Sequence, residues 1–68
     1  MAHKDVFEIF KTLFPMYAEK ATMWFPNGKN SVRVRIDELR QDFIFTFLSK
    51  KEWRFETVDI FTKTLNNK

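Results

Sequence analysis

Residues that could attack a substrate or transfer a proton are few in this chain of 68 residues. The hydroxyls of Ser31 and Ser49 and the imidazole of His3 are the candidates, and their spacing indicates no nucleophile beside an oriented base. Gly28 is the only glycine, which excludes a glycine-rich loop that would cradle phosphate. We therefore expect a protein that is not an enzyme and that binds no cofactor.

A small group of carboxylates, Asp37, Glu38 and Asp42, is the place where a cation could bind. Its spacing is not that of a calcium loop, and no glycine lies there to allow the sharp turn. The chain has no cysteine, and its single histidine lies near the N-terminus, so the ligands of a structural zinc site are missing. We expect no bound metal.

Basic side chains offer a different chemistry, namely binding. The net charge is +3 and the sequence pI is about 9.5, a balance that suits nucleic-acid binding without demanding it. Such a surface would use arginine and lysine for phosphates and an exposed Trp24 for base stacking. The residues expected to contact nucleic acid are Lys29, Arg33, Arg35, Lys50, Lys51 and Arg54.

Composition predicts one small domain, residues 1–68, with residues 1–4 frayed. A chain of this length buries only about 60% of its unfolded surface, but nine Phe, two Trp and one Tyr allow a core made mainly of rings. No apolar run approaches the roughly 20 residues of a membrane span, and the N-terminus lacks the apolar region of a secretory signal. We expect a cytoplasmic protein without membrane contact, and the Phe/Ile/Lys/Asn bias suits an AT-rich bacterial or phage genome.

The first element expected is a helix over residues 5–19. Asp5 is its predicted N-cap, and Glu8 would complete a capping box. Pro15 should end or kink the helix near Phe14 and start a fresh turn. An apolar stripe with three- and four-residue spacing supports the helix: Val6, Phe7, Phe10, Leu13, Phe14 and Tyr17.

A hairpin is expected around Asn27-Gly28, because type I′ turns need positive φ at both central residues. A two-residue turn would place Met23 opposite Val32, so that Met23 and Phe25 join the helix-covered face of the sheet. Trp24 would then point to the opposite face, and a slip of one residue would reverse this assignment.

Two more connections predict an antiparallel meander. Pairing Ile36 with Phe43, and Phe47 with Trp53, keeps hydrophobic side chains on one face across three strands, and such agreement between local signals supports the register. The segment 42–48 is apolar on both faces, which is typical of a strand buried on both sides. We therefore expect it to be a central strand.

The tail, residues 57–66, is expected to form a short helix capped by Thr57, although its β-branched residues also suit a strand. The predicted fold class is α+β, with an N-terminal helix packed on a three- to four-stranded antiparallel β-meander and a short C-terminal helix (α-β-β-β-α). This order resembles that of the double-stranded-RNA-binding domain in topology and size alone. That family carries a lysine-rich signature at the start of its second helix, whereas Lys50-Lys51 precede the last strand here and "TVDIF" contains an acid.

The second face of the predicted sheet has an apolar centre with arginines on its flanks. Three interpretations stay open: the tail, the first helix or arginine stems cover the face; it binds a protein or a second copy of the chain; or it binds nucleic acid. The leading hypothesis is a small non-enzymatic domain that binds a protein partner or self-associates through this face, and nucleic-acid binding is the alternative. The expected partner-binding residues are Trp24, Arg33, Arg35, Ile44, Leu48 and Arg54.

Overall fold

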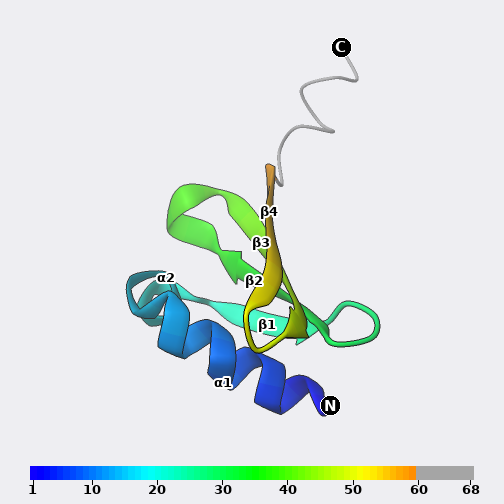
Figure 1. The fold of residues 1–68 in the computed structure, drawn as a ribbon. Helices are drawn as coiled ribbons and strands as arrows, with labels where there is room; N and C mark the ends of the chain where they lie inside the picture. The colour runs from blue at the N-terminus through cyan, green and yellow to red at the C-terminus, as the bar shows by residue number, and fades with distance from the viewer. Residues whose placement is uncertain (60–68) are drawn as a thin grey trace.

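Helices precede strands in the computed structural model, which describes residues 1–59 (Figure 1). A short 3₁₀ turn, η1 (Asp37–Leu39), joins the second strand to the third. The sheet is antiparallel with strand order β1-β2-β3-β4, so the expected α+β meander is confirmed. The elements are α1 (His3–Leu13), α2 (Pro15–Lys20), β1 (Met23–Pro26), β2 (Ser31–Ile36), β3 (Gln41–Ser49) and β4 (Glu52–Asp59).

The first helix begins at His3, earlier than predicted. The carbonyl of Ala2 already accepts hydrogen bonds from the backbone N–H groups of Asp5 and Val6, at 3.0 and 3.1 Å. No side chain caps the helix, so the predicted cap by Asp5 is wrong. The imidazole Nε2 of His3 donates to the carbonyl of Gly28 at 2.6 Å, which ties the first turn to the β1–β2 loop.

The break at Pro15 is confirmed. Phe14 leaves the helical conformation, with φ of −130° and ψ of 64°, and Pro15 opens α2 as its first residue. Proline lacks the N–H that would continue α1, and its fixed φ suits a first helical position. The chain therefore turns at Phe14, and α2 follows as a separate short helix beside α1 (Figure 1).

The core lies between α1 and one face of the sheet, as expected. Phe10 is fully buried at its centre, with its ring centroid 5.8 Å from that of Phe45. Both helices pack on this same face, since Tyr17 of α2 contacts Phe43 of β3. The buried hydrophobic core consists of Val6, Phe10, Val32, Val34, Ile36, Phe43 and Phe45.

The predicted two-residue turn between β1 and β2 is wrong. Residues 27–30 form the loop, and the N–H of Asn27 bonds the carbonyl of Ser31 at 2.9 Å. Positive φ falls on Gly28 and Asn30, at 98° and 54°, rather than on the Asn27-Gly28 pair. A type I′ turn needs adjacent residues with positive φ, so this loop closes over four residues.

The longer loop reverses the faces assigned to β1. Trp24 lies opposite Val34 and joins the helix-covered face, where its ring stacks on Phe7 with centroids 4.8 Å apart. Met23 and Phe25, expected in the core, lie opposite Arg35 and Arg33 on the other face.

The pairing of β2 with β3 is shifted by two residues from the prediction. Val34, rather than Ile36, lies opposite Phe43, and Ile36 pairs with Gln41. The cause is η1 together with its C-cap residue Arg40, which has φ of 57°; they reverse the chain within residues 37–40. Because a shift of two preserves the side-chain alternation, the faces assigned to β2 and β3 stay correct.

The pairing of β3 with β4 is confirmed, with Phe47 opposite Trp53. β3 has a neighbour on each side and is an interior strand, as expected. β4 continues from Glu52 to Asp59, so no helix begins at Thr57. The rest of the predicted C-terminal helix, residues 60–66, lies outside the described residues.

Candidate interaction surfaces

The outer face is the face of the sheet turned away from α1 and α2. Strand alternation and the pairing register define its side chains. Its members are Met23, Phe25, Ser31, Arg33, Arg35, Asp42, Ile44, Thr46, Arg54, Glu56 and Val58.

The residues predicted to bind a partner do not all share this face. Arg33, Arg35, Ile44 and Arg54 lie on it, whereas Trp24 lies on the helix-covered face. Leu48 is the extra residue of a bulge between Phe47 and Ser49, where the alternation is interrupted, and it is 49% exposed. The expected surface is thus separated into parts.

A buried carboxylate organises the centre of the outer face. Asp42 is fully buried. Arg33 Nε donates to its Oδ2 at 2.6 Å, while Arg35 Nε donates to Oδ1 at 2.8 Å and Arg35 Nη2 to Oδ2 at 3.0 Å. The guanidinium of Arg35 also lies 5.7 Å from the ring centroid of Phe25. The side chains of Arg33 and Arg35 therefore cover Asp42, and that of Arg35 also covers part of Phe25.

Electrostatics favour the ionised form of this carboxylate. The hydrogen bond from Arg35 lowers the pKa of Asp42 below its ordinary value, and Arg33 adds to this effect, although burial acts in the opposite direction. The same bond raises the pKa of Arg35. Sequence reasoning missed this network because the predicted pairing of Ile36 with Phe43 places Arg35 opposite Ile44, whereas the structure places it opposite Asp42. The sequence signal that could have revealed it is strand alternation, which places Asp42 of β3 on the same face of the sheet as Arg33 and Arg35 of β2.

The side chains considered for catalysis or metal binding have structural roles. The hydroxyl of Ser31 is buried and hydrogen-bonded to that of Thr46, with the two oxygens 2.9 Å apart. His3 is bonded to the β1–β2 loop. Within residues 1–59, no group of three or more histidine or acidic side chains is placed to hold a metal ion.

The lysines of the nucleic-acid hypothesis gather at one end of the sheet. Lys29 lies in the β1–β2 loop and Lys50-Lys51 lie in the β3–β4 turn, and a meander places these two connections at the same end. Arg54 is exposed on the outer face. Arg33 and Arg35 are hydrogen-bonded to Asp42, so these six residues do not form one surface of unpaired positive charge.

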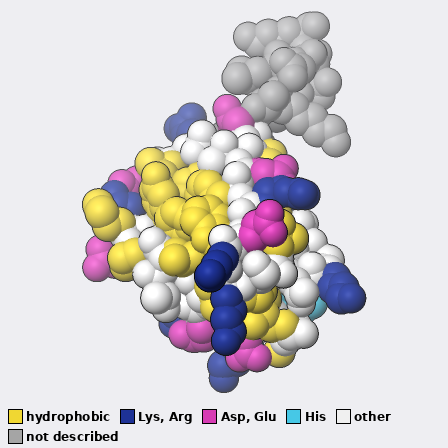
Figure 2. Space-filling model, in the orientation of Figure 1, with side chains coloured by type: hydrophobic (Ala, Val, Ile, Leu, Met, Phe, Trp, Pro, Cys, Tyr) yellow, Lys and Arg dark blue, Asp and Glu magenta, His cyan; other side chains and the backbone are white. Residues whose placement is uncertain are grey.

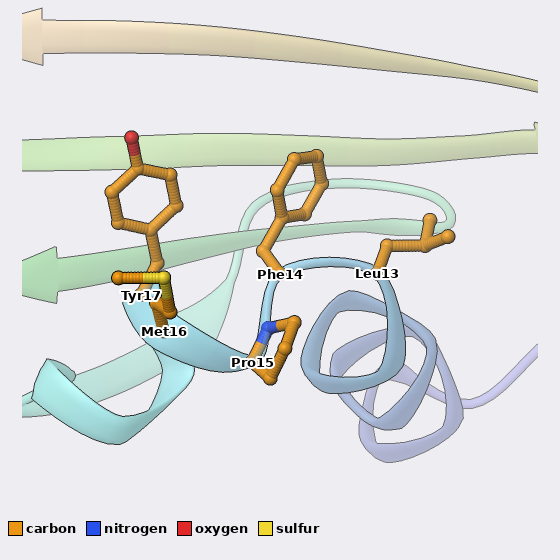
Figure 3. A pocket seen from close by; sticks show the side chains of 5 residues that line it. All are labelled: Leu13, Phe14, Pro15, Met16 and Tyr17. Carbon is orange, nitrogen blue, oxygen red and sulfur yellow. The ribbon is translucent and has the colours of Figure 1, made fainter.

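A hollow of about 290 Å³ lies where α1 meets α2. Residues 13–17 line it, and the rings of Phe14 and Tyr17 point from the helix junction toward the strands (Figure 3). Hydrophobic side chains gather in a broad patch on the side of the molecule where α2 and β4 lie (Figure 2).

Rings of β4 continue this apolar surface. Phe14 stacks on Phe55 with centroids 4.6 Å apart and meets Trp53 edge-on at 5.4 Å. We call the surface the aromatic corner; its members are Leu13, Phe14, Met16, Tyr17, Trp53 and Phe55. Met16 is 74% exposed, Leu13 43%, Trp53 41% and Tyr17 38%. In sequence, Leu13, Phe14 and Tyr17 belong to the predicted apolar stripe. In the structure Phe14 stays packed against the core, whereas Leu13 and Tyr17, on either side of the break at Pro15, are partly exposed.

The aromatic corner borders an open strand edge. β4 is the last strand of the sheet, and no other strand within residues 1–59 pairs with its outer side. It is eight residues long and contains no proline. The opposite edge, β1, has only four residues and ends at Pro26, and short edges with proline are a common protection against unwanted pairing.

Comparison with protein-family models, curated proteins and solved structures yields no match to this chain. Neither helix within residues 1–59 has the length and apolar character needed to cross a membrane. Functional inference therefore depends on the surfaces described above.

Proposed function

We propose that this chain is a non-enzymatic protein-interaction domain, and that the aromatic corner together with the open edge of β4 receives an extended protein segment. The observation that supports it is the exposure of Met16 and Tyr17 at an apolar hollow, together with that of Trp53 on the adjoining strand β4, whose outer edge pairs with no other strand within residues 1–59. An added strand would bond the backbone of β4, and its alternate side chains would pack on the corner, a known mode of peptide recognition.

Removal of exposed apolar area from water favours the binding of a partner to the aromatic corner. Contiguous exposed apolar surface marks interaction sites more often than isolated apolar residues do. Tryptophan and tyrosine are enriched among the residues that carry binding energy. Covering Met16 and Trp53, which are 74% and 41% exposed, would remove much of this apolar area from water.

The outer face supports partner binding less strongly. Met23 is 51% exposed there, but the Arg35 guanidinium lies over Phe25 and both central arginines are hydrogen-bonded to Asp42. The same pairing gives no support to nucleic-acid binding, which needs guanidinium groups available to phosphates.

Peptide display against the folded domain tests the proposal. We expect enrichment of peptides with alternating apolar residues, and we expect Trp53→Ser and Met16→Ser to weaken their binding by about tenfold or more. Met23→Ser is the matched control, because it removes a similarly exposed apolar side chain from the outer face and should leave binding unchanged.

Two results would contradict the proposal. One is the absence of any enriched peptide class, and the other is binding that responds to Met23→Ser but not to Trp53→Ser. Titration with single- and double-stranded oligonucleotides at low and moderate salt tests the alternative, because phosphate-driven binding would weaken steeply with salt.

A further inference from the structure

We propose that the segment received by β4 is the β4 strand of a second copy of this chain, paired antiparallel about a two-fold axis through Phe55. This inference rests on the proposed function and names the partner. It predicts a symmetric dimer in which two four-stranded sheets join into one continuous sheet.

The backbone of β4 is oriented for such pairing. In an antiparallel ladder each residue directs its N–H and C=O to the same side, and the side alternates along the strand. The N–H of Phe47 bonds the carbonyl of Asn30 at 2.9 Å, so the odd-numbered residues of β3 face β2 and the even-numbered ones face β4. The groups of Trp53, Phe55 and Thr57 are therefore directed toward the open edge.

Charge selects the register. If Phe55 lies opposite the partner's Phe55, then Arg54 lies opposite the partner's Glu56, and symmetry produces this pair of opposite charges twice. A register centred on Arg54 would oppose two arginines, and one centred on Glu56 would oppose two glutamates. Like charges directly opposite each other destabilise a sheet, while unlike charges stabilise it. Of these three full-length registers, the one centred on Phe55 is favoured.

The same register joins the apolar surfaces. Phe55 and Trp53 lie on the helix-covered face, so the two copies of Phe55 would meet there, with Trp53 opposite the partner's Thr57. Phe14 stacks on Phe55 within each chain, so the two aromatic corners would become one strip across the dimer axis. Backbone bonds, charge pairs and apolar contact thus favour the same arrangement.

The open edge of β1 does not offer an equal site. It has four residues, and Pro26 at its end has no N–H to donate. We therefore expect association to stop at the dimer.

Sedimentation and light scattering across a concentration series of the full chain test the dimer. Thr57→Pro should reduce the association constant by tenfold or more, because it removes an N–H directed to the open edge while sparing the β3–β4 bonds. Thr57→Val is the matched control, since it keeps that N–H and should leave the dimer intact. Circular dichroism of each variant verifies that the monomer fold is retained.

Reversing the charge at Arg54 or Glu56, and then measuring self-association, provides the decisive test. Arg54→Glu and Glu56→Arg should each weaken self-association by about tenfold, because each opposes like charges across the axis. A mixture of the two variants restores opposite charges at both positions and should form a heterodimer. Neither substitution alters a core residue.

The outcomes separate the two proposals. A chain that is monomeric up to its solubility limit overturns the dimer, and so does a dimer that is unaffected by Thr57→Pro and by both charge variants. A monomer that still binds displayed peptides in a Trp53-dependent manner would overturn the dimer alone and leave the proposed function standing.

Discussion

Arg35 and Asp42 face each other across the β2–β3 pair, and the arginine donates two hydrogen bonds, of 2.8 and 3.0 Å, to the carboxylate. Arg33 adds a third bond from the same strand. A fully buried carboxylate is unfavourable unless it is paired and hydrogen-bonded, so this network is required wherever Asp42 is ionised. It also removes two arginines from any binding role that needs them unpaired.

Acid should therefore weaken the fold through Asp42. Because the pKa of this carboxyl is lowered in the folded state, its ionised form stabilises the protein above the ordinary carboxyl pKa of about 3.9. That contribution is lost as the pH falls through the lowered pKa. Denaturant unfolding at a series of pH values measures the decline.

Asp42→Asn should remove this part of the pH dependence. At neutral pH we expect a loss of about 2–3 kcal/mol, at the lower end for a broken buried pair because the arginine side chains are 30% and 35% exposed. Glu52→Gln, at an exposed acid, is the control and should change stability little. An acid profile identical to that of the wild type would show that Asp42 does not carry the effect.

Phe45→Ala should cost about 3–5 kcal/mol, because it leaves a cavity at a fully buried position beside Phe10. In a domain of this size the loss can equal most of the free energy of unfolding. Thermal and denaturant melts measure it. A variant that melts within a few degrees of the wild type would refute the assignment of the core.

The two tryptophans should respond differently to truncation. Trp24→Ala should destabilise the fold by about 1–3 kcal/mol, since it loses both burial and the stack on Phe7. Trp53→Ala should lower stability less, because Trp53 is 41% exposed, and should mainly weaken binding. Equal losses in chemical denaturation would contradict the difference in burial between these two rings.

Gly28→Ala should cost about 1–2 kcal/mol, since φ at this position is 98° and an L side chain is strained there. A Cβ at Gly28 would meet no atom within 4 Å, so the loss arises from the backbone alone. Lys29→Ala in the same loop is the control. If both variants unfold at the same denaturant concentration, the conformational argument fails.

Patterns local to the chain predict much of this fold. Pro15 ends the first helix whatever surrounds it, because proline lacks the donor that the next turn needs. The alternation in β2, β3 and β4 assigns their side chains to faces, and the short β3–β4 connection sets the pairing of Phe47 with Trp53. These features depend on residues that are close in sequence.

The register of β1 and β2, by contrast, was decided by the tertiary structure. A shift of two residues leaves the alternation unchanged, so the sequence pattern cannot distinguish Val34 from Ile36 as the partner of Phe43. A four-residue loop in place of a two-residue turn moved Trp24 to the helix-covered face. The shift of β2 against β3 brought Asp42 opposite Arg35 and within hydrogen-bond reach of Arg33.

The sequence by itself thus determined the N-terminal helix with its break at Pro15, the antiparallel meander, and which faces of the central strands are apolar, because these depend on local patterns. Loop closure, strand register and the path of the chain after Pro15 determined which of those apolar residues stay exposed. Those quantities depend on contacts between residues far apart in sequence, and only the folded chain specifies them.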